Sequence, residues 1–333
     1  MNRYTASSRP DWPTIEAALT LAVRAPSIHN TQPWRWRVGD QSVHLYADTA
    51  RQLSAADPDQ RELLLSCGAA LHHARVAFAA LGWASLVHRL PNPAEPDHLA
   101  AIELVTHRPT ASEVALSAAI PRRRTDRRRY GDWPLPAGHM QLLIERAAGY
   151  GSVLRRIEPG PAHARLSWAL HAAAQAHLNS PAYRSELAAW SGRHAATDGV
   201  PARNATFGRA GDEFPARHFS APVLRDPGRG PDGAALLALG TASDDRLSRL
   251  RAGEALSATL LTAANIGLAS CLITEPLEMP DIRAAVRRDV LGDGAFPMAV
   301  LRIGWAPAGA GPIPSTPRRP LRDVLDPIES VTS

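Results

Sequence analysis

Two short polar segments carry residue types that could hold a ligand, and "PSIHNTQPW" (26–34) is the first. A helical run meets Pro26 here and is followed by the side chains of Ser27, Asn30 and Gln32. A chain that leaves a helix at proline also carries unpaired backbone amides and carbonyls. These groups suit hydrogen bonds to the edge of a flat heterocycle, but the same residues could simply cap the helix and turn the chain.

The second segment is the arginine run "RRRTDRRR" (122–129), with six arginines and one aspartate. Guanidinium groups bind phosphate through paired hydrogen bonds, and Thr125 adds a hydroxyl donor beside them. A solvated basic loop and a site for the nucleic-acid backbone are the two alternatives. Because no interleaved aromatic residues or second basic stripe accompany the run, we expect no nucleic-acid partner.

The excess charge of the chain is concentrated in that run. The formal net charge is +5, which equals the charge of residues 122–129, so the rest of the chain is balanced. All 37 basic residues are arginines, which excludes Schiff-base chemistry, a P-loop lysine and a lysine general base. Cys67 and Cys271 lie in separate apolar stretches, so neither a disulfide scaffold nor a cysteine zinc site is expected.

No familiar catalytic motif occurs in the sequence. It contains no P-loop, no G-x-S-x-G elbow, no H-E-x-x-H pair and no G-x-G-x-x-G that opens a helix after a strand. His29 has no second histidine at metal-ligand spacing, and His72 and His73 have no acidic partners, so we expect no metal site. Binding groups without an acid, base or nucleophile set are typical of a protein whose cofactor performs the reaction.

Helices and strands alternate along the chain, which indicates an α+β or α/β fold. Apolar residues at helical spacing predict helices over the ranges 13–24, 58–82, 137–148, 162–178, 246–266 and 280–288. A hairpin is predicted over 35–48, and further strands over 84–90, 99–106, 152–158, 234–241, 269–275 and 297–305. The tract 199–233 is rich in Gly, Pro, Arg and Phe, and a loop of this length is usually a functional lid or disordered.

One internal repeat is visible without gaps. Residues 68–85 align with residues 253–270 at a constant offset of 185, and seven of the eighteen positions are identical. The identical pairs are Gly68/Gly253, Ala70/Ala255, Leu71/Leu256, Ala79/Ala264, Gly82/Gly267, Ala84/Ala269 and Ser85/Ser270. Ala-rich helices could resemble one another by composition alone, but both copies end in Gly-x-Ala-Ser, whose glycine suits a helix C-terminus. The repeat therefore predicts two related halves in one chain.

Length and composition set the broad class of the protein. A chain of 333 residues with 45% hydrophobic content can bury a large core, in one large domain or two smaller ones. No window approaches the roughly 18–20 uninterrupted apolar residues of a membrane span, and the first residues lack the layout of a signal peptide. We therefore expect a globular, cytoplasmic protein without a membrane partner.

Four segments together resemble a known family. "APSIHNTQPW" (25–34) is similar to the flavin-ring segment of the FMN-dependent nitroreductases, and "RRRTDR" (122–127) to their Arg-Arg-Ser-x-Arg phosphate segment. "GEALSATLLTAANIGLASCLI" (253–273) resembles their central helix and following strand, and "PRRPLRDVL" (317–325) their arginine-containing tail. The ring segment precedes the phosphate segment, an order that is particular to the Acg-type nitroreductase-like proteins. The resemblance covers residues 13–326.

This resemblance implies a nitroreductase-like α+β fold in which two related halves are fused and a lid lies over the flavin. The halves would be residues 13–120 and 121–326, with the lid inserted at about 199–233. Such an intramolecular pseudo-dimer needs no partner to build its site, so a monomer or a homodimer is expected.

The resemblance also assigns residues to FMN. Its phosphate would be held by Arg123, Thr125 and Arg127, aided by Arg318 or Arg319. Its ring would lie against Pro26, Ser27, Ile28, Asn30 and Gln32, with the backbone of Ile273 and Thr274 near the reactive edge. The stretch "CLITEPLE" (271–278) departs from the Glu-Gly pair common in active members, which leaves the donor to the reactive nitrogen open.

The distribution of these segments predicts one FMN per chain. The first half has the ring segment, but its beginning, "MNRYTASSRP" (1–10), holds no arginine cluster. The second half has the cluster, but "ERAAGYGSVLRRI" (145–157) stands where a second ring segment would fall. The opposite pseudo-site is therefore expected to be empty.

Two functions fit these expectations. The first is an FMN-binding oxidoreductase that passes hydride from NAD(P)H through FMN to a small-molecule acceptor, a nitro compound or a quinone. The alternative is a protein that sequesters or stores flavin, in which the lid fills the space that a nicotinamide needs. Because FMN would carry the chemistry, no catalytic side chain is predicted.

Overall fold

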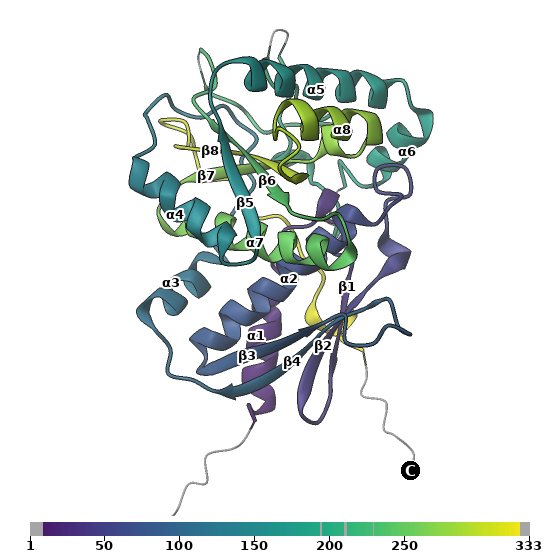
Figure 1. Ribbon diagram of the computed structural model, residues 1–333, viewed down its shortest axis with the longest axis vertical. Coiled ribbons are helices and arrows are strands. Elements are labelled where there is room, and N and C mark those ends of the chain that lie inside the picture. The colour runs from purple at the N-terminus through teal and green to yellow at the C-terminus, as the bar shows by residue number, and fades with distance from the viewer. Residues whose placement is uncertain (1–8, 194, 210–211, 229, 327–333) are drawn as a thin grey trace, which may run out of the picture.

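Two four-stranded antiparallel sheets, one above the other in Figure 1, form the framework of the protein. The computed structural model describes residues 9–193, 195–209, 212–228 and 230–326. The first sheet has the strand order β1 (Trp34–Val38), β2 (Ser42–Ala47), β4 (His98–Thr106), β3 (Trp83–Arg89). The second has the order β5 (Ser152–Ile157), β6 (Ala235–Thr241), β8 (Phe296–Gly304), β7 (Ala269–Ile273). The two sheets therefore share one topology, and the fold is α+β.

Helices lie between and around the sheets (Figure 1). In the described ranges they are α1 (Trp12–Ala22), α2 (Arg61–Ala80), α3 (Ala111–Ala119), α4 (Ala137–Ala148), α5 (Pro161–Leu178), α6 (Pro181–Ala189), α7 (Arg246–Asn265) and α8 (Pro280–Asp289). The helices α2 and α7 pack together between the two sheets. Their first residues are 185 positions apart, and so are their last residues, as in the sequence repeat.

Local sequence sets the ends of several helices. Asp11 accepts a hydrogen bond from the backbone N–H of Thr14 at 3.1 Å and so caps α1. Asp245 caps α7 in the same way, through the N–H of Ser248 at 2.7 Å. Both α2 and α7 are followed by a glycine in the left-handed region, Gly82 (φ 91°) and Gly267 (φ 83°), the conformation that glycine adopts without steric cost.

The crossing of α2 and α7 depends on two glycines. A Cβ atom placed on Gly68 would lie 2.0 Å from the backbone oxygen of Leu250, and one on Gly253 would lie 2.1 Å from that of Leu65. Leu65 and Leu250 are themselves 185 positions apart, so the contact is reciprocal. Only residues without a Cβ allow the two backbones to approach this closely.

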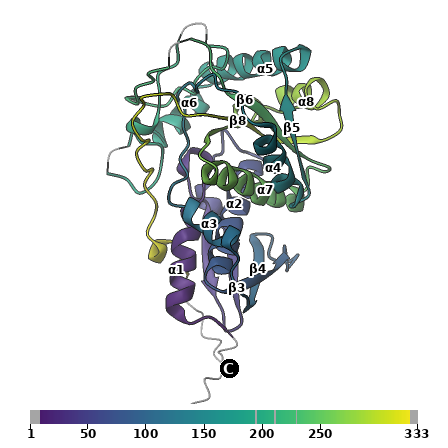
Figure 2. The ribbon, with the colours of Figure 1, turned by 90° about the vertical axis from the view of Figure 1, so that its left-hand side faces the viewer.

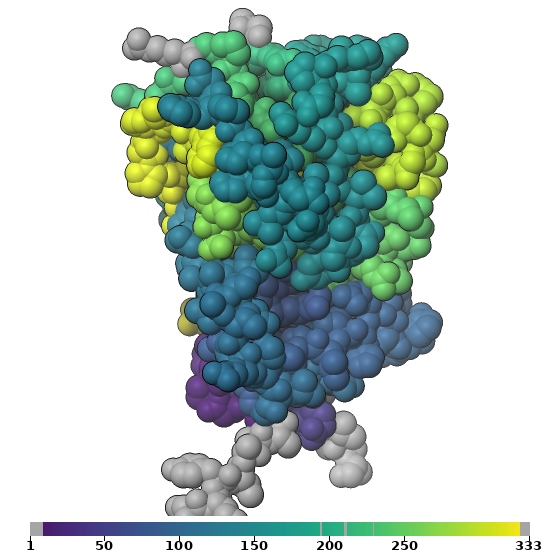
Figure 3. Space-filling view, turned by 60° about the vertical axis from the view of Figure 1, so that its left-hand side comes forward, coloured from purple at the N-terminus to yellow at the C-terminus, as the bar shows by residue number. Residues whose placement is uncertain are grey.

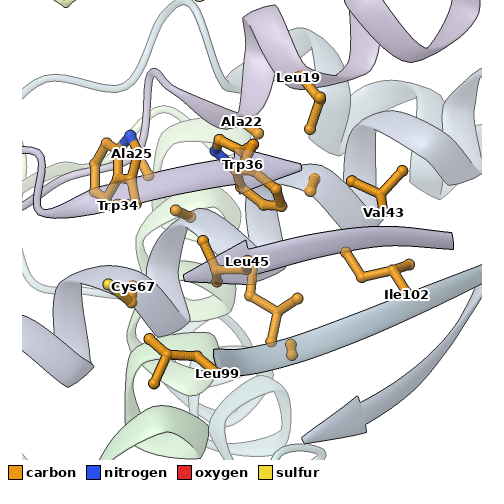
Figure 4. Close-up of a cluster of buried hydrophobic side chains, with 14 of the residues drawn as sticks. Leu19, Ala22, Ala25, Trp34, Trp36, Val43, Leu45, Cys67, Leu99 and Ile102 are labelled. Atoms are coloured by element: carbon orange, nitrogen blue, oxygen red, sulfur yellow. The ribbon is translucent and has the colours of Figure 1, made fainter. Parts of the chain in front are cut away.

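Each sheet packs its own hydrophobic core against this helix pair. The first core surrounds β1, β2 and β4 and includes the fully buried rings of Trp34 and Trp36 (Figure 4). The second lies between α4, α7 and β5–β8. The cores interlock, because Leu250 of α7 joins the first and Leu65 of α2 joins the second.

The C-terminal segment returns from the second sheet to the first. After β8 it runs down beside α1, as the yellow chain in Figure 2 shows. The N–H of Trp36 donates to the carbonyl of Val324 at 2.7 Å, and the N–H of Asp326 donates to the carbonyl of Trp36 at 2.8 Å. Arg35 forms an ion pair with Asp326. The end of this segment is thereby held against β1.

The sequence patterns predicted most of these elements. The hairpin and the six helices and six strands predicted outside it are present with ends within a few residues. The sequence analysis missed α3 and α6. The first begins with a capping box of Thr110 and Glu113, and the second with Ser180 followed by proline, so both carried short start signals that weak apolar periodicity obscured.

The helix α2 is the one described helix that is long and apolar enough to cross a membrane by length and composition. Its apolar window is 83% buried inside the protein. Such a helix is the central core element of this fold.

We expect Gly68→Ala to lower the free energy of unfolding by at least about 3 kcal/mol, because the new methyl group forces the α2–α7 crossing apart. Urea unfolding measures the effect. The matched control is Gly138→Ala in α4, where an added Cβ meets nothing within 4 Å, and where alanine should change stability by less than about 1 kcal/mol. Equal stability of the two variants would show that the close crossing is dispensable.

Candidate functional site

A cavity of about 540 Å³ lies where the loop after α1, the arginine run, strand β7 and the predicted lid tract meet. A volume of this size is typical of a small-molecule site. Its lining includes the residues Pro26, Ser27, Ile28, His29, Arg123, Thr125, Arg127, Arg129, Phe207, Phe214, Arg217, Phe219, Ser270, Ile273, Thr274 and Glu275.

The loop after α1 has an unusual backbone. Three of its residues that are not glycine lie in the left-handed region: His29 (φ 43°), Asn30 (φ 56°) and Gln32 (φ 53°). Two hydroxyl groups hold this conformation: Ser66 Oγ accepts from the N–H of Ile28 at 3.2 Å, and Ser27 Oγ accepts from the N–H of Gln32 at 2.9 Å. Such strain is kept where the surrounding structure over-determines it, often at a site.

The side chains of Asn30 and Gln32 fasten this loop to two distant segments. Asn30 Nδ2 donates to the carbonyls of Gly199 (3.0 Å) and Pro317 (3.1 Å). Gln32 Nε2 donates to the carbonyl of Thr197 (2.9 Å), and Gln32 Oε1 accepts from the N–H of Arg319 (2.8 Å). The polar residues of the loop therefore join the start of the lid tract to the C-terminal segment.

Four arginines at and beside one end of the cavity form no ion pair with the residues that the structure describes. Arg123 lines the cavity and also a small pocket beside it, which is lined by Arg24, Arg124 and Arg318. Burial, and then the charges of its arginine neighbours, lower the pKa of Arg123 to about 10 and that of Arg318 to about 9. The Nε atoms of all four are buried without a hydrogen-bond partner in the described structure. Buried like charges of this kind are stabilised by an anion.

Arg127 and Arg128, which follow in the arginine run, make different contacts. Arg127 donates to the carbonyl of Asn204 at 2.8 Å and lies 4.8 Å from the ring centre of Phe219, so it joins the cavity floor to the lid tract. Arg128 turns back onto Asp126, with Nη2 to Oδ2 at 2.8 Å, and is structural. The N–H of Asp126 donates to the carbonyl of Ser270 in β7 at 2.9 Å, which sets the run beside this edge strand.

The lid tract reaches into the site through one arginine. Arg217 is buried, forms an ion pair with Glu278, and donates to Tyr183 Oη at 2.8 Å and to His29 Nε2 at 2.7 Å. Burial lowers its pKa, but Glu278, Tyr183 and Glu275 outweigh burial and raise the pKa well above the usual value. This cluster, Arg217 with Glu278, Tyr183 and His29, is called the lid latch below.

Neighbouring titratable groups complete the lid latch. Burial, followed by the charges of Arg217 and Arg127, lowers the pKa of His29 well below its usual value, so His29 is neutral and accepts from Arg217. His177 Nδ1 lies 3.1 Å from Oε1 of Glu275, which lines the cavity. In the described residues no group of three His, Cys, Asp or Glu is placed to hold a metal ion.

No family model matches the chain. Known relatives do match it over nearly the whole length. The Mycobacterium tuberculosis H37Rv protein named "Putative NAD(P)H nitroreductase Rv3131" is 51% identical over 320 residues, which cover 95% of this chain and 92% of that protein. "Putative NAD(P)H nitroreductase acg" of the same strain is 37% identical over 330 residues, covering 93% and 95%. The chain belongs to the Acg-type nitroreductase-like family.

Solved structures of nitroreductases are more distant from this chain. One from Anabaena variabilis has 11% sequence identity and a TM-score of 0.45, and covers 90% of each chain. One from Bacteroides fragilis, solved with bound FMN, has 14% identity and a TM-score of 0.38, and covers 59% of this chain and 90% of its own.

The twelve residues predicted from the sequence to bind FMN in this Acg-type protein fall into two groups, those that line the cavity and those that do not. Eight of them line the cavity: Pro26, Ser27, Ile28, Arg123, Thr125, Arg127, Ile273 and Thr274. Four do not, namely Asn30, Gln32, Arg318 and Arg319. Asn30 and Gln32 fasten the loop, and Arg319 lies 3.4 Å from Asp48. Arg318 donates to the carbonyls of Arg24 and Ala25, in the small pocket beside the cavity.

The sequence analysis missed the lid latch. Arg217 is one of 37 arginines and has no local signature that distinguishes it. Glu275 and Glu278 lie in "CLITEPLE", which the sequence analysis noted only as a departure from a familiar pattern. Only their burial and their mutual contacts identify them.

We expect Arg217→Met to lower the free energy of unfolding by about 3–5 kcal/mol, because it leaves the fully buried carboxylate of Glu278 without its partner. The double variant Arg217→Met/Glu278→Gln should regain most of this loss, since it removes the unpaired charge. The control is Arg209→Met, an exposed arginine of the same tract that should cost less than about 1 kcal/mol. Urea unfolding of all three variants at neutral pH tests this; equal losses for Arg217→Met and Arg209→Met would contradict it.

Proposed function

We propose that this protein binds one FMN and acts as an oxidoreductase that takes hydride from NAD(P)H and delivers electrons to a nitro compound or a quinone. The observation that carries the proposal is the group of four arginines whose buried Nε atoms have no partner in the described structure: Arg123 lines the cavity that also contains the loop 26–29, and the other three line the small pocket beside it. Membership of the Acg-type family supports the proposal, since two relatives from Mycobacterium tuberculosis carry the name "Putative NAD(P)H nitroreductase".

The phosphate of FMN fits the arginine end of the cavity. Arg123 carries a buried Nε without a partner, and Thr125 lies beside it in the lining. A phosphate dianion would satisfy these donors and neutralise part of the charge that lowers the pKa of Arg123 and Arg318. Arg123, Thr125 and Arg127 would hold it, with Arg318 and Arg124 as the second layer of charge.

The ring would lie between the loop 26–29 and the edge strand β7. Ser27 and Ile28 line the cavity from one side, and Ile273 and Thr274 line it from the other. When bound, FMN supplies two-electron transfer between a nicotinamide and an acceptor. Arg217 would add positive charge beside the ring, and the phenylalanines of the lid tract would exclude water.

The second candidate function, flavin sequestration, is favoured by the lid latch. Residues 206–207, 212–217 and 219 of the predicted lid form part of the cavity wall, and residues 210, 211 and 229 lie outside the described residues. Arg217 ties this wall to Glu278 and to His29 beneath it. A lid held by a buried ion pair would oppose entry of a nicotinamide.

We also infer that residues 13–120 and 121–326 are two fused halves of an intramolecular pseudo-dimer with a single flavin site. The support is the shared strand order of the two sheets and the reciprocal glycine contact of α2 and α7. In such a chain the loop 26–29 comes from one half and Arg123 from the other.

We expect the purified protein to bind FMN, to bleach rapidly when NADPH is added without oxygen, and to regain its colour when a nitroarene is added. The visible spectrum records each step. FMN-bound protein that stays yellow with NADPH would contradict the oxidoreductase and favour sequestration. Protein that takes up no FMN would contradict both functions.

Site variants test the position of the phosphate. We expect Arg123→Gln/Arg127→Gln to raise the Kd for FMN about 100-fold or more, because each charged hydrogen bond contributes roughly 1.5–3 kcal/mol. The control Arg122→Gln/Arg156→Gln removes the same charge at two exposed positions, one of them in the same run, and should change the Kd less than about threefold. Equal effects of the two variants would show that only net charge matters.

A further inference from the structure

Besides the first cavity, two adjoining cavities lie between the two halves, on another side of the α2–α7 pair. Each has a volume of about 490 Å³, and they share three lining residues: Arg75, Arg146 and Tyr150. In Figure 3 the boundary between the halves crosses this side of the molecule, with blue residues below and teal and green residues above. The two cavities together are called the basic cavity below.

The basic cavity occupies the place in the repeat that corresponds to the flavin-site candidate. Leu260 and Ser270 line the first cavity, and the residues 185 positions earlier, Arg75 and Ser85, line the basic cavity. The loop between α1 and β1 contributes Pro26–His29 to the first cavity. The corresponding loop between α4 and β5 contributes Gly149–Gly151 to the second. The fold thus builds a cavity twice and lines it differently each time.

Arginines from four different elements converge on the basic cavity: Arg75 (α2), Arg89 (β3), Arg146 (α4) and Arg251 (α7). Two of them are compensated by the buried carboxylate of Glu254, which lies 2.7 Å from Arg75 Nη1 and 2.7 Å from Arg89 Nε. The ion pairs of Arg75 and Arg89 with Glu254 hold one wall of the cavity in place. Arg146 and Arg251 are the other two arginines of the lining.

Arg146 and Arg251 have no ion-pair partner among the described residues. The Nε of Arg146 is buried without a hydrogen-bond partner, an orphaned donor at the edge of the cavity. Two carboxylates line the basic cavity: Glu145 is exposed and accepts a hydrogen bond from Gln141 at 2.9 Å, and Glu113 lies 2.9 Å from Nε2 of His107. Glu113, Glu145 and Glu254 offset three of the four arginine charges, so one positive charge stays uncompensated, and none of the three carboxylates forms an ion pair with Arg146 or Arg251 among the described residues.

We propose that the basic cavity is a second ligand site, which binds a diphosphate group through Arg146 and Arg251. A planar guanidinium group can donate two parallel hydrogen bonds to two oxygens of a phosphate, and an anion would satisfy the orphaned donor of Arg146. Tyr150 is already covered, since its ring lies edge to face with His72 at 5.0 Å and carries Arg75 at 5.3 Å. It therefore forms a fixed wall, and recognition rests on the phosphates rather than on a stacked flat ring.

The same diphosphate chemistry is found in free pyrophosphate and in a nucleoside diphosphate. We expect pyrophosphate to bind the purified protein at about 150 mM salt, measured by isothermal titration calorimetry. Arg146→Gln/Arg251→Gln should weaken this binding at least about tenfold, and Arg146→Lys/Arg251→Lys should keep part of it. ADP that binds more tightly than pyrophosphate would identify the nucleotide as the source, and equal affinity would identify the free anion.

Two control variants locate the binding. Arg123→Gln/Arg127→Gln removes charge from the first cavity, and Arg156→Gln/Arg288→Gln removes the same charge from the exposed surface. With FMN saturating the first cavity of the wild-type protein and of Arg156→Gln/Arg288→Gln, both variants should bind pyrophosphate like the wild-type protein. Absence of binding to the wild-type protein, a loss confined to Arg123→Gln/Arg127→Gln, or equal losses in all charge-removing variants would overturn the proposal.

Thermal unfolding checks that each variant is folded, and the single exposed variant Arg251→Gln provides a second reading if Arg146→Gln is unstable. FMN binding, read from the visible spectrum, is an independent measurement.

Discussion

The close crossing of α2 and α7 is the constraint on which the rest of the structure depends. Gly68 and Gly253 let each backbone approach the carbonyl of a leucine on the other helix, and no other residue type fits there. Because the contact is reciprocal, it brings two sheets of the same strand order to opposite sides of one helix pair. The first cavity and the basic cavity both include residues of this helix pair, together with loops and arginines from segments far apart in the sequence.

The buried guanidinium groups of this protein differ in whether a carboxylate pairs with them. A chain without lysine uses guanidinium groups both as structure and as binding groups, and the two uses differ in their partners. Arg128 and Arg217 are paired with buried carboxylates and hold segments in place. Arg123 and Arg146 end in buried donors without partners, and each lines a cavity. Desolvating an unpaired cation is costly, so such positions are where an anionic ligand gains most.

Much of this could be predicted from the sequence because the signals are local. Helical periodicity, the Gly-x-Ala-Ser exits and the 185-residue offset predicted the elements and the repeat. Two short motifs predicted six residues of the cavity lining, and the family resemblance added Ile273 and Thr274. The orientation of Asn30 and Gln32 away from the cavity could not be predicted, because it depends on left-handed backbone angles held by Ser66 and by chain segments far along the sequence. The contacts of Arg217 are equally non-local, as its partners come from α6, the segment before α8 and the loop after α1. No sequence motif marks the basic cavity, because its four arginines are spread over 177 positions of the chain.

The number of FMN molecules bound per chain is the most direct test of whether the repeated scaffold carries a single flavin site. Equilibrium dialysis of the purified protein against FMN, with protein concentration from amino-acid analysis, gives this number without any assumption about turnover. We expect a plateau at one FMN per chain. A plateau at two would show that both halves build a flavin site, and the absence of saturable binding would show that neither does.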